Sequence, residues 1–347
     1  MLKNLTRTHY IIIAAILAVV VAVVIVAVVV LADDDDGEDQ EVTAVKLQLS
    51  WFYESEFAGF FAAVDQGYYE DEGLAVEILG SGFDDDGNYI DPVPLVVSGE
   101  ATFGLMSADN LLRARAEGQP VVAIATTFQR SPRAYISLEE KGITTPADFV
   151  GQRVVVRSDL EMTYAAMLAQ AGVDRAQVNE ITDSDLFSMD ALKDDLVDVT
   201  PGFVTSEVID LEQQGFAVNT VMIGTYGVED YQNLIFTTED VVQNQPELVT
   251  SFLKATIQGF EYEVENPNAV AELALQYDPN LDVATQRAMV AASVPLIAPA
   301  GSQIGDMDPQ IWENIGQLMV SSGAIEAEAL DIEGVYTLQF INAAYEE

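Results

Sequence analysis

The segment Trp51–Phe57 carries residues well suited to binding a small molecule. It follows a strand predicted over 45–51, and in open α/β sheets ligands collect beyond the carboxyl ends of strands. Trp51 and Tyr53 offer flat faces on which a ring can stack, and Glu56 offers a carboxylate that accepts hydrogen bonds from N–H groups. The same aromatic rings could instead seal a helix against the sheet, so both interpretations stay open here.

Two further strand ends carry polar groups. Ser107 follows a strand that ends near Met106, and it is placed to cap a helix that runs to Glu117. A helix N-terminus presents free N–H groups, which makes it a ready site for an anion or a carbonyl. The loop after the next strand contributes the candidate ligand-binding residues Phe128, Gln129 and Arg130. Arg130 could bind an anion, or it could pair with one of the many acidic residues.

The middle third of the chain adds four candidates near predicted strand ends, namely Glu161, Phe203, Thr205 and Glu207. A carboxylate buried beside an aromatic ring costs several kcal/mol unless it is paired. Such a site would therefore select ligands that are rich in N–H donors or carry positive charge.

Several classes of chemistry are excluded by composition. The chain has no cysteine, and its one histidine, His9, precedes the apolar N-terminal run and cannot reach a folded site. Thiol nucleophiles, iron–sulfur clusters, Ser-His-Asp triads and HExxH zinc sites are thus excluded. No P-loop is present, Gly80-Ser-Gly82 lacks the third glycine of a dinucleotide motif, and 84–88 lacks two key positions of an EF-hand loop. We therefore expect no cofactor, no bound metal, and a solvated loop at 84–88.

The charge of the chain is strongly acidic. Asp and Glu number 57 against 14 Lys and Arg, a formal net charge of −43. Such a chain lacks the basic face that a nucleic-acid-binding protein needs. Self-repulsion of this size destabilises a compact protein unless salt screens it. Because the acidic residues are spread along the chain, we interpret them as a solvated surface and expect a salt-adapted source.

The N-terminus predicts a membrane anchor. An unbroken apolar run, 11–32, lies between Lys3 and Arg7 on one side and an aspartate run on the other. A helix of that length spans about 30 Å of hydrocarbon, and the flanking charges place everything downstream outside the cell. We predict a cytoplasmic stub at 1–10, a transmembrane signal-anchor at 11–32 and an acidic linker at 33–44. A cleaved signal peptide is the alternative.

Strands and helices alternate through the rest of the chain. Strands are predicted at 45–51, 75–79, 121–127, 134–138, 153–157, 220–223 and 234–237. Helices are predicted to begin at Ser107, at Ser158 and at Pro246. This alternation predicts an α/β protein with largely parallel sheets.

A series of motifs resembles the solute-binding proteins related to thiamine-pyrimidine synthase. The resemblance begins with LSW (49–51), FAGFFAAVDQGYY (57–69) and EGLAVEI (72–78). It continues through VSGEATFG (97–104), GQPVVAIA (118–125), YGV (226–228), FTTE (236–239), PELV (246–249), ENP (265–267) and MDPQIW (307–312). Together these motifs cover the chain from about Val45 to about Phe340. These motifs identify the family with high specificity, but they do not identify the ligand.

The resemblance implies a type II periplasmic-binding-protein fold, in which two α/β lobes close about a hinge on a small molecule. By similarity, 45–138 and 234–347 form lobe 1 and 139–233 forms lobe 2. Trp51, the 53–56 loop, Ser107, the 128–131 loop, Glu161 and 203–207 would line the cleft between them. Proteins of this kind deliver solute to an ABC permease and its ATPase.

The same family contains an enzyme that consumes its own histidine, holds pyridoxal phosphate on a lysine and uses a cysteine cluster with iron. Because the cysteines are absent here and His9 precedes the anchor, we expect a binding protein and no enzyme. The carboxylates and aromatic rings favour a heteroaromatic solute like a thiamine pyrimidine precursor. An anionic solute (sulfonate, taurine or nitrate) and riboflavin are the alternatives, as is an anchored ligand-sensing surface protein.

Overall fold

The first sheet is built from largely apolar segments, most of which are buried on both faces. In the computed structural model, which describes residues 42–82, 89–157 and 160–346, five strands take the order β2-β1-β3-β10-β4. Their bounds are β1 Thr43–Gln48, β2 Leu74–Leu79, β3 Phe103–Met106, β4 Val121–Thr126 and β10 Leu234–Thr238. All six residues of β4 are buried, as expected for a strand covered by helices on both sides. Only β10 runs antiparallel to its neighbours.

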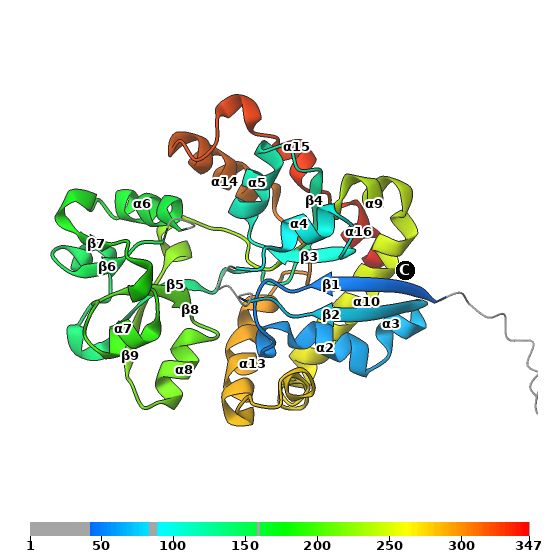
Figure 1. Ribbon diagram of the computed structural model, residues 1–347, viewed down its shortest axis with the longest axis horizontal. Helices are drawn as coiled ribbons and strands as arrows, with labels where there is room; N and C mark the ends of the chain where they lie inside the picture. Colours follow the sequence, from blue (N-terminus) through cyan, green and yellow to red (C-terminus); the bar gives the residue numbers. More distant parts are fainter. Residues whose placement is uncertain (1–41, 83–88, 158–159, 347) are drawn as a thin grey trace, which may run out of the picture. The chain divides into compact units, whose positions relative to one another are not determined.

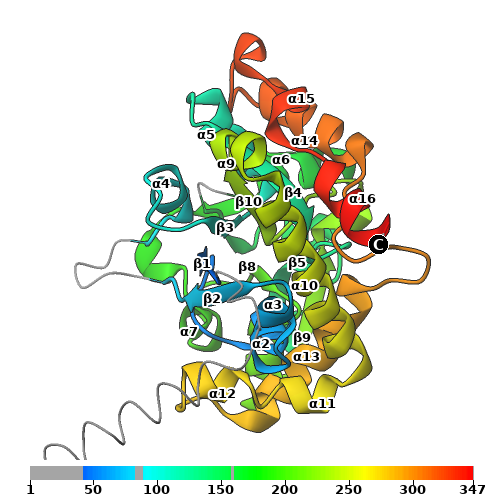
Figure 2. The ribbon, with the colours of Figure 1, turned by 90° about the vertical axis from the view of Figure 1, so that its right-hand side faces the viewer.

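Helices cover both faces of this sheet (Figure 1). One core cluster joins it to helices α2, α10 and α16, and a second joins it to α4, α5, α14 and α15. The bounds are α2 Ala58–Asp65, α3 Tyr68–Asp71, α4 Pro92–Val97, α5 Ala108–Ala116, α9 Glu239–Asn244, α10 Pro246–Glu265, α11 Pro267–Val270, α12 Ala274–Tyr277, α13 Val283–Ile297, α14 Pro309–Ser321, α15 Ile332–Val335 and α16 Gln339–Glu346. We call this sheet and its helices the first lobe. Figure 2 shows α10 crossing it next to α2 and α3.

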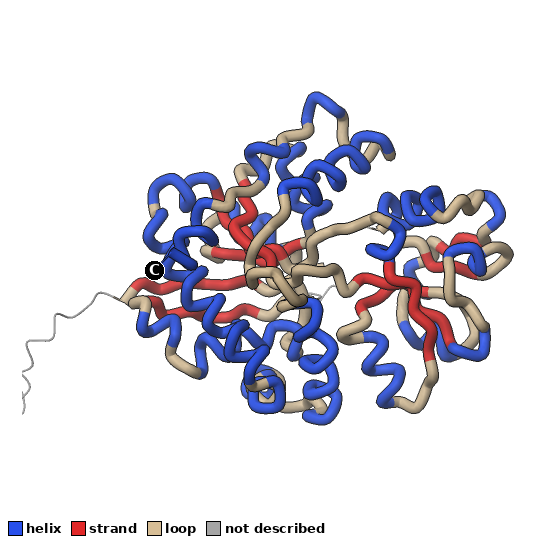
Figure 3. Tube along the Cα trace, turned by 180° about the vertical axis from the view of Figure 1, so that it is seen from behind, coloured by secondary structure: helices blue, strands red, loops and turns tan. Residues whose placement is uncertain are grey.

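The second lobe repeats the same strand order with shorter strands. A three-stranded sheet, β8-β5-β9, continues into the pair β6-β7 through a parallel bridge between Val154 and Val199. The bounds are β5 Arg133–Leu138, β6 Arg153–Val155, β7 Asn179–Ile181, β8 Thr200–Phe203, β9 Val218–Met222, α6 Glu161–Gln170, α7 Met189–Lys193 and α8 Glu207–Gln213. Figure 3 shows the strands of the two lobes as separate groups. Both lobes belong to one unit that begins at Val42.

Strand β5 corrects one boundary of the sequence analysis. We predicted that the first lobe extends to Leu138, but β5 pairs with β8 and β9 of the second lobe. The chain therefore crosses between the lobes at about 127–132 and returns at about 228–233. In each sheet the strand that follows a crossing, β5 or β10, runs antiparallel to both neighbours, so the sheets are mixed.

The N-terminal predictions lie almost wholly outside the described residues. The stub 1–10, the signal-anchor 11–32 and most of the linker 33–44 are in this category, as are the loop 84–88 and the capping position Ser158. The last two residues of the predicted linker, 43 and 44, instead belong to β1, which begins at Thr43. Within 42–82, 89–157 and 160–346, no helix combines the length and the apolarity needed to cross a membrane.

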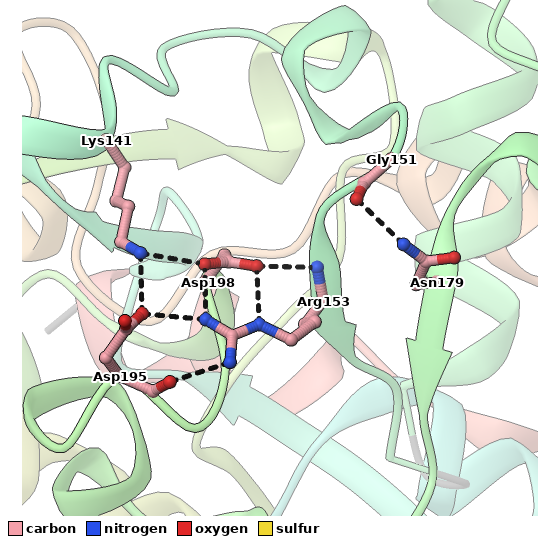
Figure 4. A network of polar contacts seen from close by, with 6 residues as sticks. All are labelled: Lys141, Gly151, Arg153, Asn179, Asp195 and Asp198. Carbon is pink, nitrogen blue, oxygen red and sulfur yellow. Dashed lines mark hydrogen bonds and ion pairs between the residues drawn. The ribbon is translucent and has the colours of Figure 1, made fainter.

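Four charged side chains tie together three segments of the second lobe (Figure 4). Asp198, whose side chain is 8% exposed, accepts hydrogen bonds from Lys141 at 3.0 Å and from the Arg153 side chain at 2.8 and 2.9 Å. Asp195 pairs with the same two cations. The hydrogen bond from Arg153 is the main reason that the pKa of Asp198 lies well below its usual range.

We expect Asp198→Asn to lower the free energy of unfolding by about 1–3 kcal/mol at neutral pH, because charge-assisted hydrogen bonds are lost in a mostly buried position. A depressed carboxyl pKa stabilises the fold above the unfolded pKa and loses that effect as pH falls through the folded pKa. The loss should therefore shrink toward acid pH in urea titrations. Asp190→Asn is the control, because the Asp190 side chain is 76% exposed and forms an exposed ion pair with Lys193. Equal losses in both variants would contradict this role.

Candidate functional site

Trp51 lies at the surface edge of the first lobe, just beyond β1. Its ring is partly buried and packs against the first core cluster. It meets Phe52 edge to face, with ring centroids 5.2 Å apart, and lies 6.3 Å from Tyr89. Phe52 and Tyr89 are 47% and 40% exposed. The segment after β1 therefore presents aromatic rings at the surface, with the partly buried ring of Trp51 among them.

Tyr53 is held within the first lobe by its own contacts. Its hydroxyl donates to the Ile78 carbonyl at 3.2 Å, and its ring lies 5.4 Å from that of Tyr277. The ring also covers Gly80, where any Cβ would meet it at 2.8 Å. These contacts pack Tyr53 within the first lobe. Binding of a solute by Tyr53 stays a prediction.

Two carboxyl groups occupy the short 3₁₀ helix η1, Ser55–Phe57, and the residue before it. Glu56 is 6% exposed and accepts a short hydrogen bond from the Asn233 side chain. Burial raises the pKa of Glu56 to about 7, and Glu207 adds to the rise. Burial also raises the pKa of Glu54 well above its usual range, and Glu56 and Glu207 raise it further. The pKa values of both carboxyl groups are thus shifted upward by the same burial.

Asn233 connects this carboxyl pair to the returning crossing. It is a non-glycine residue in the left-handed region, with φ of 52°, which asparagine tolerates better than most side chains. Its Oδ1 accepts from Ser50 Oγ at 2.8 Å while its amide donates to Glu56. The sequence analysis missed Asn233 and did not single out Glu54. The available signal was an asparagine directly before an apolar strand.

Ser107 is placed as predicted, but its side chain does not cap the helix. It precedes α5 with extended backbone angles and is 8% exposed. Its Oγ accepts a hydrogen bond from Asn110 Nδ2 at 2.9 Å and caps no backbone N–H. The N–H groups of the first turn are thus not covered by this hydroxyl.

The loop after β4 is anchored to the first lobe. Phe128 is 1% exposed and belongs to the first core cluster. Gln129 donates through its side chain to the Asp306 carbonyl at 3.0 Å, and the backbone N–H groups of Gln129 and Arg130 both donate to the Leu296 carbonyl. The Arg130 side chain is exposed. Solute contact by Phe128, Gln129 and Arg130 stays a prediction. For Phe128 it would require the buried ring to leave the core cluster.

The start of α8 gathers three of the predicted residues. Glu207 accepts from the Phe203 N–H and from Ser206 Oγ, both at 2.8 Å. Thr205 is 1% exposed, and its Oγ1 has no hydrogen-bond partner among the described residues. Glu161 lies apart from this turn: its side chain is 56% exposed and pairs with Arg175 at 3.0 Å.

Carboxyl groups of the two lobes influence one another electrostatically here. Glu207 raises the pKa of both Glu54 and Glu56, and Asp210 of α8 raises that of Glu54. The η1 turn also packs on α13, where the Ser55 N–H donates to Gln286 Oε1 at 2.7 Å, and α13 in turn contacts α8. The candidate site therefore centres on Glu56 and Asn233, which a hydrogen bond joins, with Glu54 and Trp51 nearby along the chain and Glu207 acting on the carboxyl groups electrostatically.

Positive charge is scarce around this site because the cations are already paired. At least nine of the twelve Lys and Arg side chains in the described residues lie within 4.0 Å of a carboxylate. Arg133, near the crossings, is 6% exposed and is held by Asp230 at 2.8 Å and by Gln232 at 3.1 Å.

The described residues offer no metal-binding cluster. Among the described residues, no group of three or more His, Asp or Glu side chains could hold a metal ion. A cavity of about 10 Å³ lies elsewhere, between β4, β10 and α10 of the first lobe, and it is lined mainly by apolar residues. It has room for one water molecule at most.

The fold matches that of solved periplasmic binding proteins. The aliphatic sulphonate binding protein SsuA of Escherichia coli superposes with a TM-score of 0.67 over 84% of this chain and 91% of that chain, at 12% identity. At this identity the match establishes a periplasmic-binding-protein-like α/β fold, which confirms that part of the predicted fold.

Curated relatives cover most of the chain. The riboflavin-binding protein RibY of Chloroflexus aurantiacus is 27% identical over 86% of this chain and 86% of its own length. The formylaminopyrimidine-binding protein of Halalkalibacterium halodurans is 26% identical over 80% of this chain and 85% of its own. A 4-amino-5-hydroxymethyl-2-methylpyrimidine phosphate synthase of Legionella pneumophila is 26% identical over 86% and 92%. The family model described as NMT1/THI5 like matches residues 54–270. This confirms the resemblance seen in the motifs: the chain belongs to the NMT1/THI5-like family.

Proposed function

We propose that this protein is the extracytoplasmic solute-binding component of an ABC importer and that it binds a small heteroaromatic solute like a thiamine pyrimidine precursor. The observation that carries this proposal is that Glu54 and Glu56 of one lobe and Glu207 of the other act on one another electrostatically, close in the chain to the partly buried ring of Trp51. Carboxyl groups orient N–H donors, and an aromatic ring stacks on the heterocycle. The lobes of a type II binding fold would close on the solute about the two crossings.

An anionic solute is the weaker candidate for a physical reason. Binding a sulfonate or nitrate requires cations or free N–H donors, whereas the charged groups of the candidate site are acidic. Arg133 is buried and held by Asp230, which leaves exposed Arg130 and the N-terminus of α5 as the donors near strand ends.

Riboflavin is the second candidate, because one relative is named for binding it and because Phe52 and Tyr89 extend the aromatic surface beside Trp51. Isothermal titration against pyrimidines, riboflavin, taurine and nitrate tests the proposal. We expect measurable affinity for a pyrimidine and none for taurine or nitrate. Binding of an anion alone would overturn the proposed solute class.

A binding role without catalysis is also part of the proposal, although one relative is named as a synthase. It is supported by the lack of cysteine and by the position of His9 ahead of the apolar run. Incubation of each bound solute with the protein, followed by mass spectrometry, should return the solute unchanged.

Attachment to the outer face of the cell membrane by residues 11–32 completes the proposal. It rests on the length of the apolar run and on its flanking charges. Externally added protease should digest the folded part on intact cells, and the protein should stay with the membrane after high-salt washing. Expression from one operon with a permease and an ATPase would favour import over the alternative of an anchored sensor.

We also expect the protein to gain stability with salt. With a net charge of −43, the acidic side chains repel one another at low ionic strength, and 1 M salt shortens the screening length to about 3 Å. The melting temperature should rise by roughly 5 °C or more between 0.1 and 2 M KCl. Sucrose at matched osmolality is the control, because it acts by exclusion rather than by screening. An equal rise in sucrose would count against charge repulsion as the cause.

A further inference from the structure

An apolar contact joins the two lobes in addition to the crossings. Helix α6 of the second lobe contacts α14 of the first lobe (Figure 1). Met162, in the first turn of α6, is 9% exposed and belongs to the second core cluster, whose other members come from the first lobe and the returning crossing. Leu318 of α14 packs against that cluster and also against the second-lobe cluster that contains Tyr164 and Leu168. Each lobe thus packs one side chain against the core of the other.

This contact is small compared with the core of either lobe. Two lobes connected by two crossings are expected to move relative to each other unless a large apolar interface holds them together. Here two helix pairs connect them, α6 with α14 and α8 with α13. Methionine suits a surface that has to separate and pack again, because its unbranched side chain adapts to irregular gaps.

The position of α6 indicates which arrangement of the lobes the contact favours. The strands of the second lobe lie in the order β9-β5-β8-β6-β7, and the crossings connect to β5 and β9, near one edge. Helix α6 follows β6, toward the other edge, so its first turn lies near the carboxyl end of that strand. Ligands of open α/β sheets bind beyond the carboxyl ends of strands. Met162 therefore lies on the side of the cleft, and opening the cleft would separate it from the first lobe.

We propose that Met162 and Leu318 form a latch that favours the closed arrangement of the lobes, and that they raise the affinity for solute as positioning residues. The latch itself does not depend on the identity of the solute, and only its effect on affinity rests on the proposed function. The apparent dissociation constant equals the intrinsic one divided by the fraction of molecules in the binding-competent state. A weaker latch lowers the closed fraction and therefore weakens binding.

The test compares Leu318→Ala with Ile311→Ala. Both residues are partly buried, lie on α14 and pack against the second core cluster. Leu318 also packs against the second lobe, whereas Ile311 packs against the second core cluster alone among the core clusters of the described residues. Met162→Ala removes the latch from the other lobe, and it keeps the test available if Leu318→Ala does not fold.

The distance between the lobes is the first measurement, and it needs no solute. Because the chain has no cysteine, Glu70→Cys and Glu212→Cys provide one nitroxide label on each lobe, at exposed positions of α3 and α8. Pulsed electron paramagnetic resonance should give longer and broader distances in Leu318→Ala and in Met162→Ala than in Ile311→Ala. Equal distributions in the two α14 variants, or shorter distances in Leu318→Ala, would overturn the latch.

The second measurement is calorimetric titration with 4-amino-5-hydroxymethyl-2-methylpyrimidine. Leu318→Ala should bind it about 10-fold more weakly than Ile311→Ala does, a difference of about 1.4 kcal/mol. At saturation the solute should restore the short distances in Leu318→Ala, because a ligand that binds the closed state shifts the population toward it. Longer distances without any loss of affinity would contradict the role of the latch in binding.

The latch and the proposed function fail in different ways. If the distances respond to Leu318→Ala but the pyrimidine does not bind to any form of the protein, the proposed solute class is overturned and the latch is supported. If the pyrimidine binds equally to both α14 variants and their distances agree, the latch is overturned and the proposed function stands.

Discussion

Replacing Trp51 with alanine is expected to weaken the binding of a heteroaromatic solute by about 10- to 100-fold. Stacking of a heterocycle on an aromatic side chain is worth about 1–3 kcal/mol, and 1.4 kcal/mol corresponds to a factor of ten. Trp51 is suited to this role because its ring lies at the edge of the core cluster and not inside it. The dissociation constant should be measured by calorimetry with 4-amino-5-hydroxymethyl-2-methylpyrimidine as the solute. Trp51→Phe keeps a smaller stacking face and should give an intermediate value.

Arg130→Ala is the matched comparison for this experiment. The Arg130 side chain is exposed, whereas its backbone N–H donates to the Leu296 carbonyl. We expect its removal to change the affinity for the pyrimidine by no more than about two-fold, as for an exposed charge. Melting curves of both variants without solute show whether a loss of affinity reflects a loss of fold. A larger effect for Arg130→Ala than for Trp51→Ala would favour an anionic solute.

Gly259→Ala is expected to lower the free energy of unfolding by about 3 kcal/mol or more. Gly259 lies in α10 where this helix crosses α2, and a Cβ there would overlap the backbone carbonyl oxygen of Gly59 and approach the Ala63 Cβ to 2.7 Å. Overpacking of a close contact typically costs about 1–3 kcal/mol, and a backbone obstacle cannot move aside as a side chain can. Alanine in a helix interior would otherwise stabilise by about 1 kcal/mol relative to glycine, so a loss would identify the close approach as its cause.

Gly224→Ala is the control for this prediction. No atom outside its chain neighbours lies within 4 Å of the position a Cβ would take at Gly224, and its φ is not positive. We expect a change of no more than about 0.5 kcal/mol, the usual range for a surface substitution. Urea unfolding at one fixed salt concentration gives both values. Similar small changes in the two variants would mean that α2 and α10 can separate at little cost. Because α2 follows η1 directly, a movement of α2 away from α10 would also move Glu54 and Glu56.

Several of the strands that the sequence identified share one physical property. Segments such as 121–127 and 234–237 are continuous apolar runs, because helices cover both faces of the sheet they form. The strand β8 was missed, since it contains Pro201 and Gly202, and β7 was missed because its three residues are only partly buried or exposed. Apolar patterning reports burial, and it fails where a short strand is half covered.

The assignment of β5 to the wrong lobe has a different origin. An apolar run of six residues predicts a buried strand, but it contains no information about which sheet the strand joins. That choice was made by pairing with β8 and β9, which lie about 65 and 85 residues further along the chain. Pairings over such separations depend on the whole topology, and local patterns do not encode them.

By itself the sequence determined the α/β class, the family, and the strand ends at which Trp51, Glu56 and Ser107 lie, because apolar periodicity and motif order are local properties. Only the tertiary structure decided which of these groups meet. It buried Phe128 in the core, paired Glu161 with Arg175, and brought Glu54 and Glu56 within electrostatic reach of Glu207. The physical reason is that the two crossings bring distant segments together, and burial raises the pKa of Glu54 and Glu56.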